Sequence, residues 1–246
     1  MTVVTGAIET PVRPRGVVAD AIAAYRSQFR RVALTAVAVY VPLGFFEAYL
    51  VDVGKGYFDH HDGALAALLF AAVLLFTSLS FAGDAIFAGF LDAAVGEEYH
   101  GHPHRHLGDV IRHLPYRQLI IANVILGALI AGGSLALLVP GIVAFTLFCL
   151  VGPLVNIERL SVRSAFRRSF RLVRPVFPVA ALIVTLPVLL EHEVAHALQV
   201  WAERSYGLKA VVDGLLAAGV YSVVGMIEVT LAYVLIRRDS ANRDPM

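Results

Sequence analysis

Residues 118–157 read QLIIANVILGALIAGGSLALLVPGIVAFTLFCLVGPLVNI and contain no charged side chain. A helix needs about 20 apolar residues to cross the hydrocarbon core of a bilayer, so this stretch is long enough for two crossings. Helices are expected because they pair their own backbone groups, whereas an open strand would leave those groups unsatisfied in lipid. The Pro140-Gly141 pair is expected to form the tight turn between the two helices.

The rest of the chain is similarly apolar. Of the 246 residues, 58% are hydrophobic and 16% are charged, whereas a soluble domain carries about a quarter charged residues. We therefore expect an all-α fold, namely a polytopic membrane helix bundle with six transmembrane helices and cytoplasmic interfacial amphipathic helices. Residues 17–238 are expected to form this single domain between flexible tails at 1–16 and 239–246. The six apolar runs lie at about 32–53, 63–95, 118–138, 140–157, 176–201 and 210–236.

The distribution of Lys and Arg predicts the orientation of these spans. The segments before the first run, after the second, after the fourth and after the sixth each contain at least three arginines. The other connections contain only Lys55, no basic residue, and the pair Arg204 and Lys209, respectively. Since cytoplasmic loops carry the excess of basic residues, both termini are expected in the cytoplasm of a multi-pass plasma-membrane protein. The net charge of +1 gives no sign of nucleic-acid binding, and the expected partner is the bilayer.

Three motifs resemble one membrane-protein family. GHPHRHLGDVIRHL at 101–114 is similar to its Gly-x-Pro stretch before a cytoplasmic helix, and ERLSVRSAFRRSFRLVRPVF at 158–177 is similar to its Arg-rich helix. LAYVLIRRD at 231–239 is similar to its usual ending. The family is the glycerophosphoryl diester phosphodiesterase membrane-domain family with its uncharacterised bacterial relatives. The matching positions of the Arg-rich helix are Glu158, Ala165, Arg168, Ser169, Leu172 and Arg174.

This resemblance implies a six-helix membrane module and a bacterial inner membrane. It does not imply phosphodiesterase chemistry, because the catalytic barrel of that enzyme is absent from this chain. The His-rich form of the 101–114 loop departs from the family pattern.

The Arg-rich segment also has a direct physical interpretation. At helical spacing, one face carries arginines and another carries Val162, Phe166, Phe170 and Val173. Such a helix can lie in the inner interface with its phenylalanines in the acyl boundary and its arginines among anionic lipid headgroups. The alternative is an ordinary topology signal. The candidate headgroup ligands are Arg163, Arg167, Arg171 and Arg174.

The motif His192-Glu193-Val194-Ala195-His196 has the HExxH pattern. On a helix this pattern places two imidazoles one turn apart as zinc ligands, with the glutamate as general base. Glu47 lies at a matching depth and is the candidate third ligand. Further signatures of intramembrane zinc proteases are absent, so the alternative is that these residues mark the wet outer end of the fifth span. We expect no cofactor, with zinc as the alternative.

A second group of histidines alternates through HGHPHRH at 100–106, where the even-numbered positions would share one face of an extended chain. This face could hold a metal, but an ordinary polar cytoplasmic loop is the alternative. Acidic residues inside spans are costly and indicate function by default, and here they are Glu47, Asp84 and Glu228. Asp239, beyond the last span, is expected to be exposed.

The leading hypothesis is therefore a non-enzymatic membrane module that acts in lipid interaction, membrane organisation or as a transport accessory. A second hypothesis is a membrane-embedded zinc hydrolase that uses His192, His196 and Glu193. A third is a small transporter whose buried acids line a path.

Overall fold

The computed structural model describes residues 12–58, 87–92, 95–96, 112–136, 138–202 and 206–243. These residues are helical apart from short turns, and no strand occurs among them, which confirms the predicted helical class. The helices are α1 (Pro14–Ser27), α2 (Phe29–Phe58), α5 (Tyr116–Ala136), α6 (Leu138–Phe148), α7 (Val151–Ile157), α8 (Val162–Val173), α9 (Phe177–Ala180), α10 (Leu186–Ala202) and α11 (Tyr206–Arg243). A 3₁₀ turn (Arg174–Val176) precedes α9, and a π-helical turn (Ala181–Thr185) follows it.

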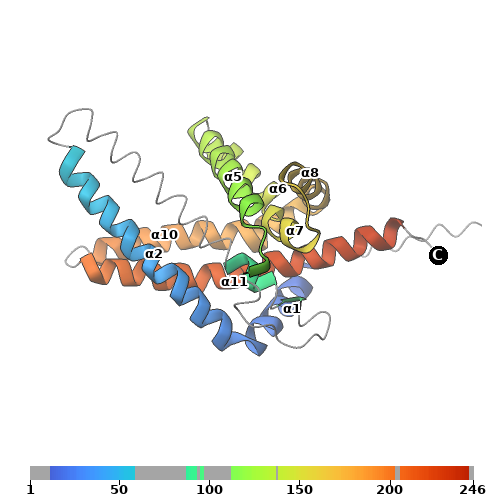
Figure 1. The fold of residues 1–246 in the computed structure, drawn as a ribbon, viewed down its shortest axis with the longest axis horizontal. Coiled ribbons are helices and arrows are strands. Elements are labelled where there is room, and N and C mark those ends of the chain that lie inside the picture. The colour runs from blue at the N-terminus through green and yellow to red at the C-terminus, as the bar shows by residue number, and fades with distance from the viewer. Residues whose placement is uncertain are drawn as a thin grey trace, which may run out of the picture.

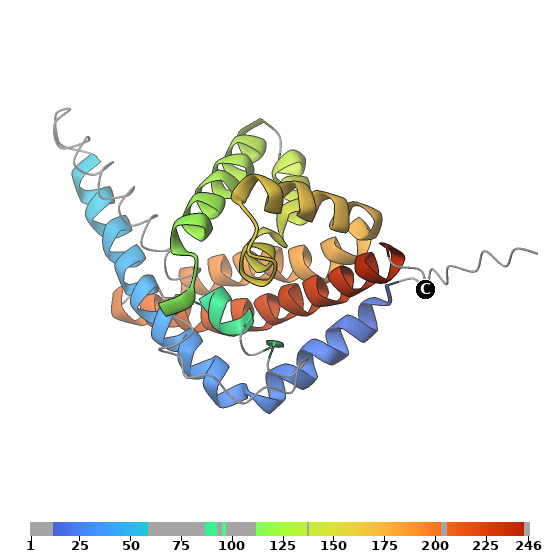
Figure 2. The same cartoon turned by 45° about the vertical axis from the view of Figure 1, so that its right-hand side comes forward.

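The long helix α11 is the axis on which the other elements assemble. It runs along the length of the molecule, with α10 beside it and α2 crossing it (Figure 1). Helix α1 also packs on α11, on the opposite side from α5, α6 and α7 (Figure 2). Because α11 continues to Arg243, it extends into the segment at 239–246 that the sequence analysis treats as a tail.

Three stretches of the described residues are long and apolar enough to cross a membrane: Val139–Ile157, Val162–Glu191 and Ala210–Asn242. The second begins with α8, so its apolar part follows the turn at Arg174–Val176. Most of the run at 63–95 lies outside the described residues, and the six-span count stays a prediction.

Large aliphatic side chains cover the outer surfaces of these helices. Val139, Leu182, Leu190 and Leu215 are 67%, 54%, 56% and 49% exposed, respectively. Soluble proteins rarely expose contiguous apolar surface of this kind, because it drives association in water. Exposed aliphatic side chains of this kind are stable in the hydrocarbon core of a bilayer.

Glycines allow α2 and α11 to cross at close range. A Cβ atom on Gly214 of α11 would lie 2.7 Å from the Cα of Val41 in α2, and one on Gly44 would lie 2.9 Å from the backbone oxygen of Ala210. Small residues matter here because helices in lipid associate mainly through packing, without a hydrophobic driving force. Ala218, one turn after Gly214 on α11, is also buried, at 3% exposed.

Helices α5 and α6 form a hairpin that also depends on a close glycine contact. The bounds of α6 correct the prediction that Pro140 and Gly141 form the turn. Pro140 and Gly141 do not form the turn, because α6 begins at Leu138 and includes both residues in its first turn. Proline is tolerated there because the first N–H groups of a helix have no intrahelical acceptor. A Cβ atom on Gly133 of α5 would lie 2.8 Å from the backbone nitrogen of Gly141, so the glycine serves close packing of the two helices.

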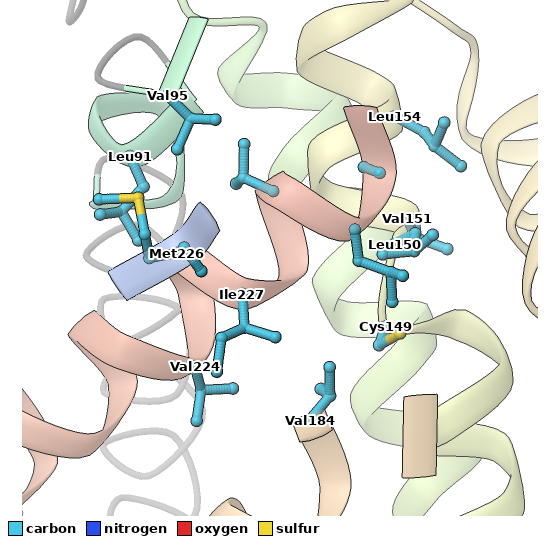
Figure 3. Packing of buried hydrophobic residues seen from close by; sticks show 14 of the residues in the cluster. Leu91, Val95, Cys149, Leu150, Val151, Leu154, Val184, Val224, Met226 and Ile227 are labelled. Atoms are coloured by element: carbon cyan, nitrogen blue, oxygen red, sulfur yellow. The ribbon is translucent and has the colours of Figure 1, made fainter. Parts of the chain in front are cut away.

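The apolar core lies where α7, α11 and the helical residues 87–92 and 95–96 meet. Figure 3 shows Val224, Met226 and Ile227 of α11 between Leu91 on one side and the side chains of α7 on the other. Tyr233 of α11 also donates a hydrogen bond to the Asp92 carboxylate at 3.4 Å. Helix α11 therefore joins the helical residues around Leu91 to helix α7.

The glycine crossing generates a prediction. We expect Gly214→Ala to destabilise the protein by about 1–3 kcal/mol, because the added methyl group meets the backbone of α2. The matched control is Gly219→Ala on the same helix, where a Cβ atom meets nothing within 4 Å. Thermal unfolding in detergent measures both variants, and equal midpoints would contradict the close crossing.

Candidate functional site

Helix α8 carries the arginine-rich sequence, and its buried face is narrow. The N-cap residue of this helix is Ser161, whose backbone is extended and whose carbonyl accepts a hydrogen bond from the N–H of Ala165 at 2.9 Å. Ala165, Ser169 and Leu172 are 0%, 0% and 6% exposed, a spacing of three to four residues that places them on one helical face. These small or slender side chains allow α8 to lie close to α6 and α7.

The direction of α8 differs from that of its neighbours. Figure 1 shows α8 nearly end-on, while α10 and α11 run across the page. The chain changes direction at Arg174–Val176, where Pro175 lies in a 3₁₀ turn. Helix α8 therefore lies across the bundle instead of along it, as an interfacial helix would if α10 and α11 cross the membrane.

Arg168 holds α8 in this position. Its Nε and Nη2 atoms donate to the two carboxylate oxygens of Glu158, at 3.2 and 3.1 Å, and its Nη1 atom donates to the Asp239 carboxylate. The Arg168 side chain is 10% exposed, and those of Glu158 and Asp239 are 22% and 25% exposed. One guanidinium thus joins the end of α7, the middle of α8 and the last turns of α11.

This ion-pair cluster was missed in the sequence analysis, and the expectation that Asp239 is exposed is wrong. The signal in the sequence is the position of Arg168, three residues after Ala165 and four before Leu172, which places it on the buried face of α8. A charged side chain on a buried face predicts a partner. The sequence alone did not identify that partner, because Asp239 lies seventy-one residues away.

Two further hydrogen bonds hold α8 and the turn that precedes it. The Ser169 hydroxyl donates to the Leu147 carbonyl at 2.8 Å. Leu147 lies in the last turn of α6, where carbonyls lack intrahelical donors. Arg159, in the α7–α8 turn, has φ of +52°, and its Nη1 atom donates to the His113 carbonyl at 2.9 Å. The left-handed backbone of Arg159 costs of order 1 kcal/mol and is held by these surrounding contacts.

The four candidate headgroup ligands are all exposed. Arg163, Arg167 and Arg171 form no ion pair with any residue that the structure describes, and the guanidinium of Arg174 lies 5.8 Å from the centre of the Phe170 ring. The predicted apolar face is partly corrected. Phe166 is half-buried against Phe148, with ring centroids 5.1 Å apart, and Val173 is buried, so only Phe170 is exposed as predicted.

The HExxH motif lies on α10, and its backbone is helical from His192 to His196. Glu193 is exposed, while the side chains of His192, His196 and Glu47 lie outside the described part of the structure. Among the residues that are described, no group of three His, Cys, Asp or Glu side chains could hold a metal. The zinc site therefore stays a hypothesis, as does a metal at the histidine loop 100–106, which also lies outside the described residues together with Asp84.

Comparisons with protein families, curated proteins and solved structures find no match to this chain. The functional argument therefore rests on the geometry of its own residues.

Neighbouring arginines give a matched test of the ion-pair cluster. We expect Arg168→Ala to cost about 2 kcal/mol of stability, between the values for surface and fully buried pairs, because two carboxylates lose their partner. Arg167→Ala removes the same side chain from the exposed face and is expected to change stability by less than about 0.5 kcal/mol. Detergent unfolding curves compare the two, and equal losses would show that the cluster does not hold α8.

Proposed function

We propose that this chain is a non-enzymatic membrane module that binds anionic lipid headgroups through Arg163, Arg167, Arg171 and Arg174. In this proposal six helices cross the plasma membrane, both termini lie in the cytoplasm, and α8 lies at the inner interface. The work of such a module is lipid interaction, membrane organisation or support of transport. The observation that carries the proposal is the division of the arginines in this segment. Arg168 is paired, whereas the other three arginines of α8 and Arg174 in the turn after it are exposed.

The fixed position of α8 supports headgroup binding. Arg168, Ser169 and the Arg159 turn hold the backbone through contacts to α6, α7, α11 and His113. The exposed arginines are therefore presented by a preorganised surface, so less ordering entropy is lost when a ligand binds. An arginine guanidinium binds phosphate with paired hydrogen bonds, and each basic residue near an anionic membrane contributes about 1 kcal/mol.

The polarity of the helix also fits an interface. Arg171 and Arg174 point away from the protein, while the exposed Phe170 lies beside Arg174 on the outer surface. An exposed aromatic ring next to a cation is the combination found where acyl chains meet headgroups. No described residue supplies a comparable observation in favour of the zinc hydrolase.

Lipid selectivity tests this proposal. The full-length protein is reconstituted in nanodiscs that contain equal amounts of phosphatidylglycerol and phosphatidylcholine, and native mass spectrometry counts the lipids that it retains. We expect the wild type to retain phosphatidylglycerol preferentially. The triple variant R163A/R167A/R171A is expected to lose this preference, because three contacts of about 1 kcal/mol each correspond to roughly a hundredfold in affinity.

A matched control removes the same charge elsewhere. R15A/R26A/R30A changes three exposed arginines on or beside α1 and is expected to retain most of the selectivity. If both triple variants lose selectivity equally, total basic charge and not α8 attracts the lipid, and the proposed site is wrong.

A further inference from the structure

A cavity of about 290 Å³ lies between the first turns of α1 and the last turns of α11. The charged groups among the described residues that line it are Arg13, Asp20 and Arg238, and Val17 and Val234 supply apolar walls. The lining positions of α1 recur every three to four residues, so one face of that helix borders the cavity. Side chains of both signs therefore border one space.

The register of α1 on α11 places these charges along the cavity. The hydroxyl groups of Tyr25 and Ser222 share a hydrogen bond at 3.3 Å. The helices are antiparallel, because the start of α1 lies beside the last turns of α11 (Figure 2). Counted from this hydrogen bond, Arg13 and Arg238 lie about 18 and 24 Å along their helices, whereas Asp20 lies only about 8 Å along α1. The two arginines are therefore at one end of the cavity, and the carboxylate is at the other.

These three charges have no partners in the part of the chain that the structure describes. The side chains of Arg13, Asp20 and Arg238 form no ion pair or hydrogen bond with any described residue. Two guanidinium groups without a carboxylate between them repel each other, and a shared anion removes that repulsion. The carboxylate at the far end favours a positive group in the same way. The cavity therefore suits one ligand that carries both charges.

The position of the cavity identifies the source of such a ligand. Arg238 directly precedes Asp239, whose carboxylate is bonded to Arg168 of α8. The cavity and α8 therefore lie at the same end of α11, with α1 on the other side of that helix (Figure 2). This step rests on the proposed function, in which α8 lies at the inner interface. Lipid phosphates lie at that level.

We propose that this cavity binds the phosphoethanolamine headgroup of a membrane lipid. Arg13 and Arg238 contact the phosphate, because guanidinium groups bind phosphate oxygens with paired hydrogen bonds. Asp20 accepts hydrogen bonds from the ammonium group. The surface of α8 binds anionic headgroups, whereas this cavity selects a headgroup with both charges.

The alternative ligands each lack one of these interactions. Phosphatidylcholine has the same phosphate, but its quaternary nitrogen has no N–H group to donate to Asp20. Phosphatidylglycerol has hydroxyl donors but no positive charge. Inorganic phosphate has neither a positive group nor an acyl chain that would hold it at the membrane.

Three lipids with identical acyl chains separate these ligands. Native mass spectrometry of the purified full chain in an uncharged, phosphate-free detergent measures the dissociation constants of phosphatidylethanolamine, phosphatidylcholine and phosphatidylglycerol. The protein carries R163A/R167A/R171A, so the outcome does not depend on whether α8 binds anionic lipid. We expect phosphatidylethanolamine to bind most tightly, by about tenfold over phosphatidylcholine, because a charge-assisted hydrogen bond is gained. Equal binding of phosphatidylethanolamine and either other lipid, or its displacement by an equal concentration of inorganic phosphate, overturns the proposal.

Substitutions of the charged residues assign the two ends of the ligand. Asp20→Asn preserves the shape of the side chain and is expected to remove the preference for phosphatidylethanolamine over phosphatidylcholine. R13A/R238A is expected to weaken the binding of both lipids by about tenfold or more, because the phosphate contacts are lost. The control R15A/R26A removes two exposed arginines of α1 that do not line the cavity and is expected to change neither affinity. Equal losses in the two double variants would contradict the assigned cavity.

A glycine substitution tests the cavity without removing a charge. Gly16 lines the cavity, and a Cβ atom there meets nothing within 4 Å, so Gly16→Leu fills space without a backbone clash. Leucine also favours a helix more than glycine does, so α1 is expected to fold. The control is Gly219→Leu on α11, which has open space at its Cβ position and does not line the cavity. We expect only Gly16→Leu to lose binding, and equal binding by the two folded variants would contradict the site even if R13A/R238A does not fold.

Discussion

The ion-pair cluster of Arg168 with Glu158 and Asp239 is the constraint on which the position of helix α8 depends. It holds α8 against the end of α7 and the last turns of α11. Helix α8 buries only four side chains completely or nearly so, those of Ala165, Ser169, Leu172 and Val173. One guanidinium bonded to two carboxylates therefore joins α8 to α7 and α11 where packing alone is weak. The pairing of the buried Arg168 therefore fixes the helix that presents the exposed arginines.

The apolar part of the bundle is held together differently. In hydrocarbon, aliphatic side chains gain nothing by leaving lipid for protein, so close backbone contact must supply the stability. Gly44 and Gly214 bring α2 and α11 together, and Gly133 and Gly141 do the same for α5 and α6. A cavity beside Glu228, lined by α2, α5, α7, α10 and α11, is a place where such packing is incomplete. A polar junction at one end and glycine contacts along the helices together account for the fold.

The sequence predicts local features well and distant pairings poorly. Apolar runs locate α2, α5, α10 and α11, because a span is defined by the composition of consecutive residues. Exposure of the four outer arginines follows from helical spacing. The Arg168–Asp239 pair and the Glu228 cavity depend on how distant helices meet, which periodicity does not encode. The position of the turn near Pro140 was wrong because proline suits the first turn of a helix as well as a loop.

A double-mutant cycle on Arg168 and Asp239 tests this account most directly. The free energy of unfolding is measured for the wild type, Arg168→Ala, Asp239→Ala and the double variant in the same detergent. Coupled residues lose less together than the sum of their separate losses. The structure predicts a coupling energy of about 1–2 kcal/mol between these two side chains. Strictly additive losses would show that the pair does not fix α8 to the end of α11.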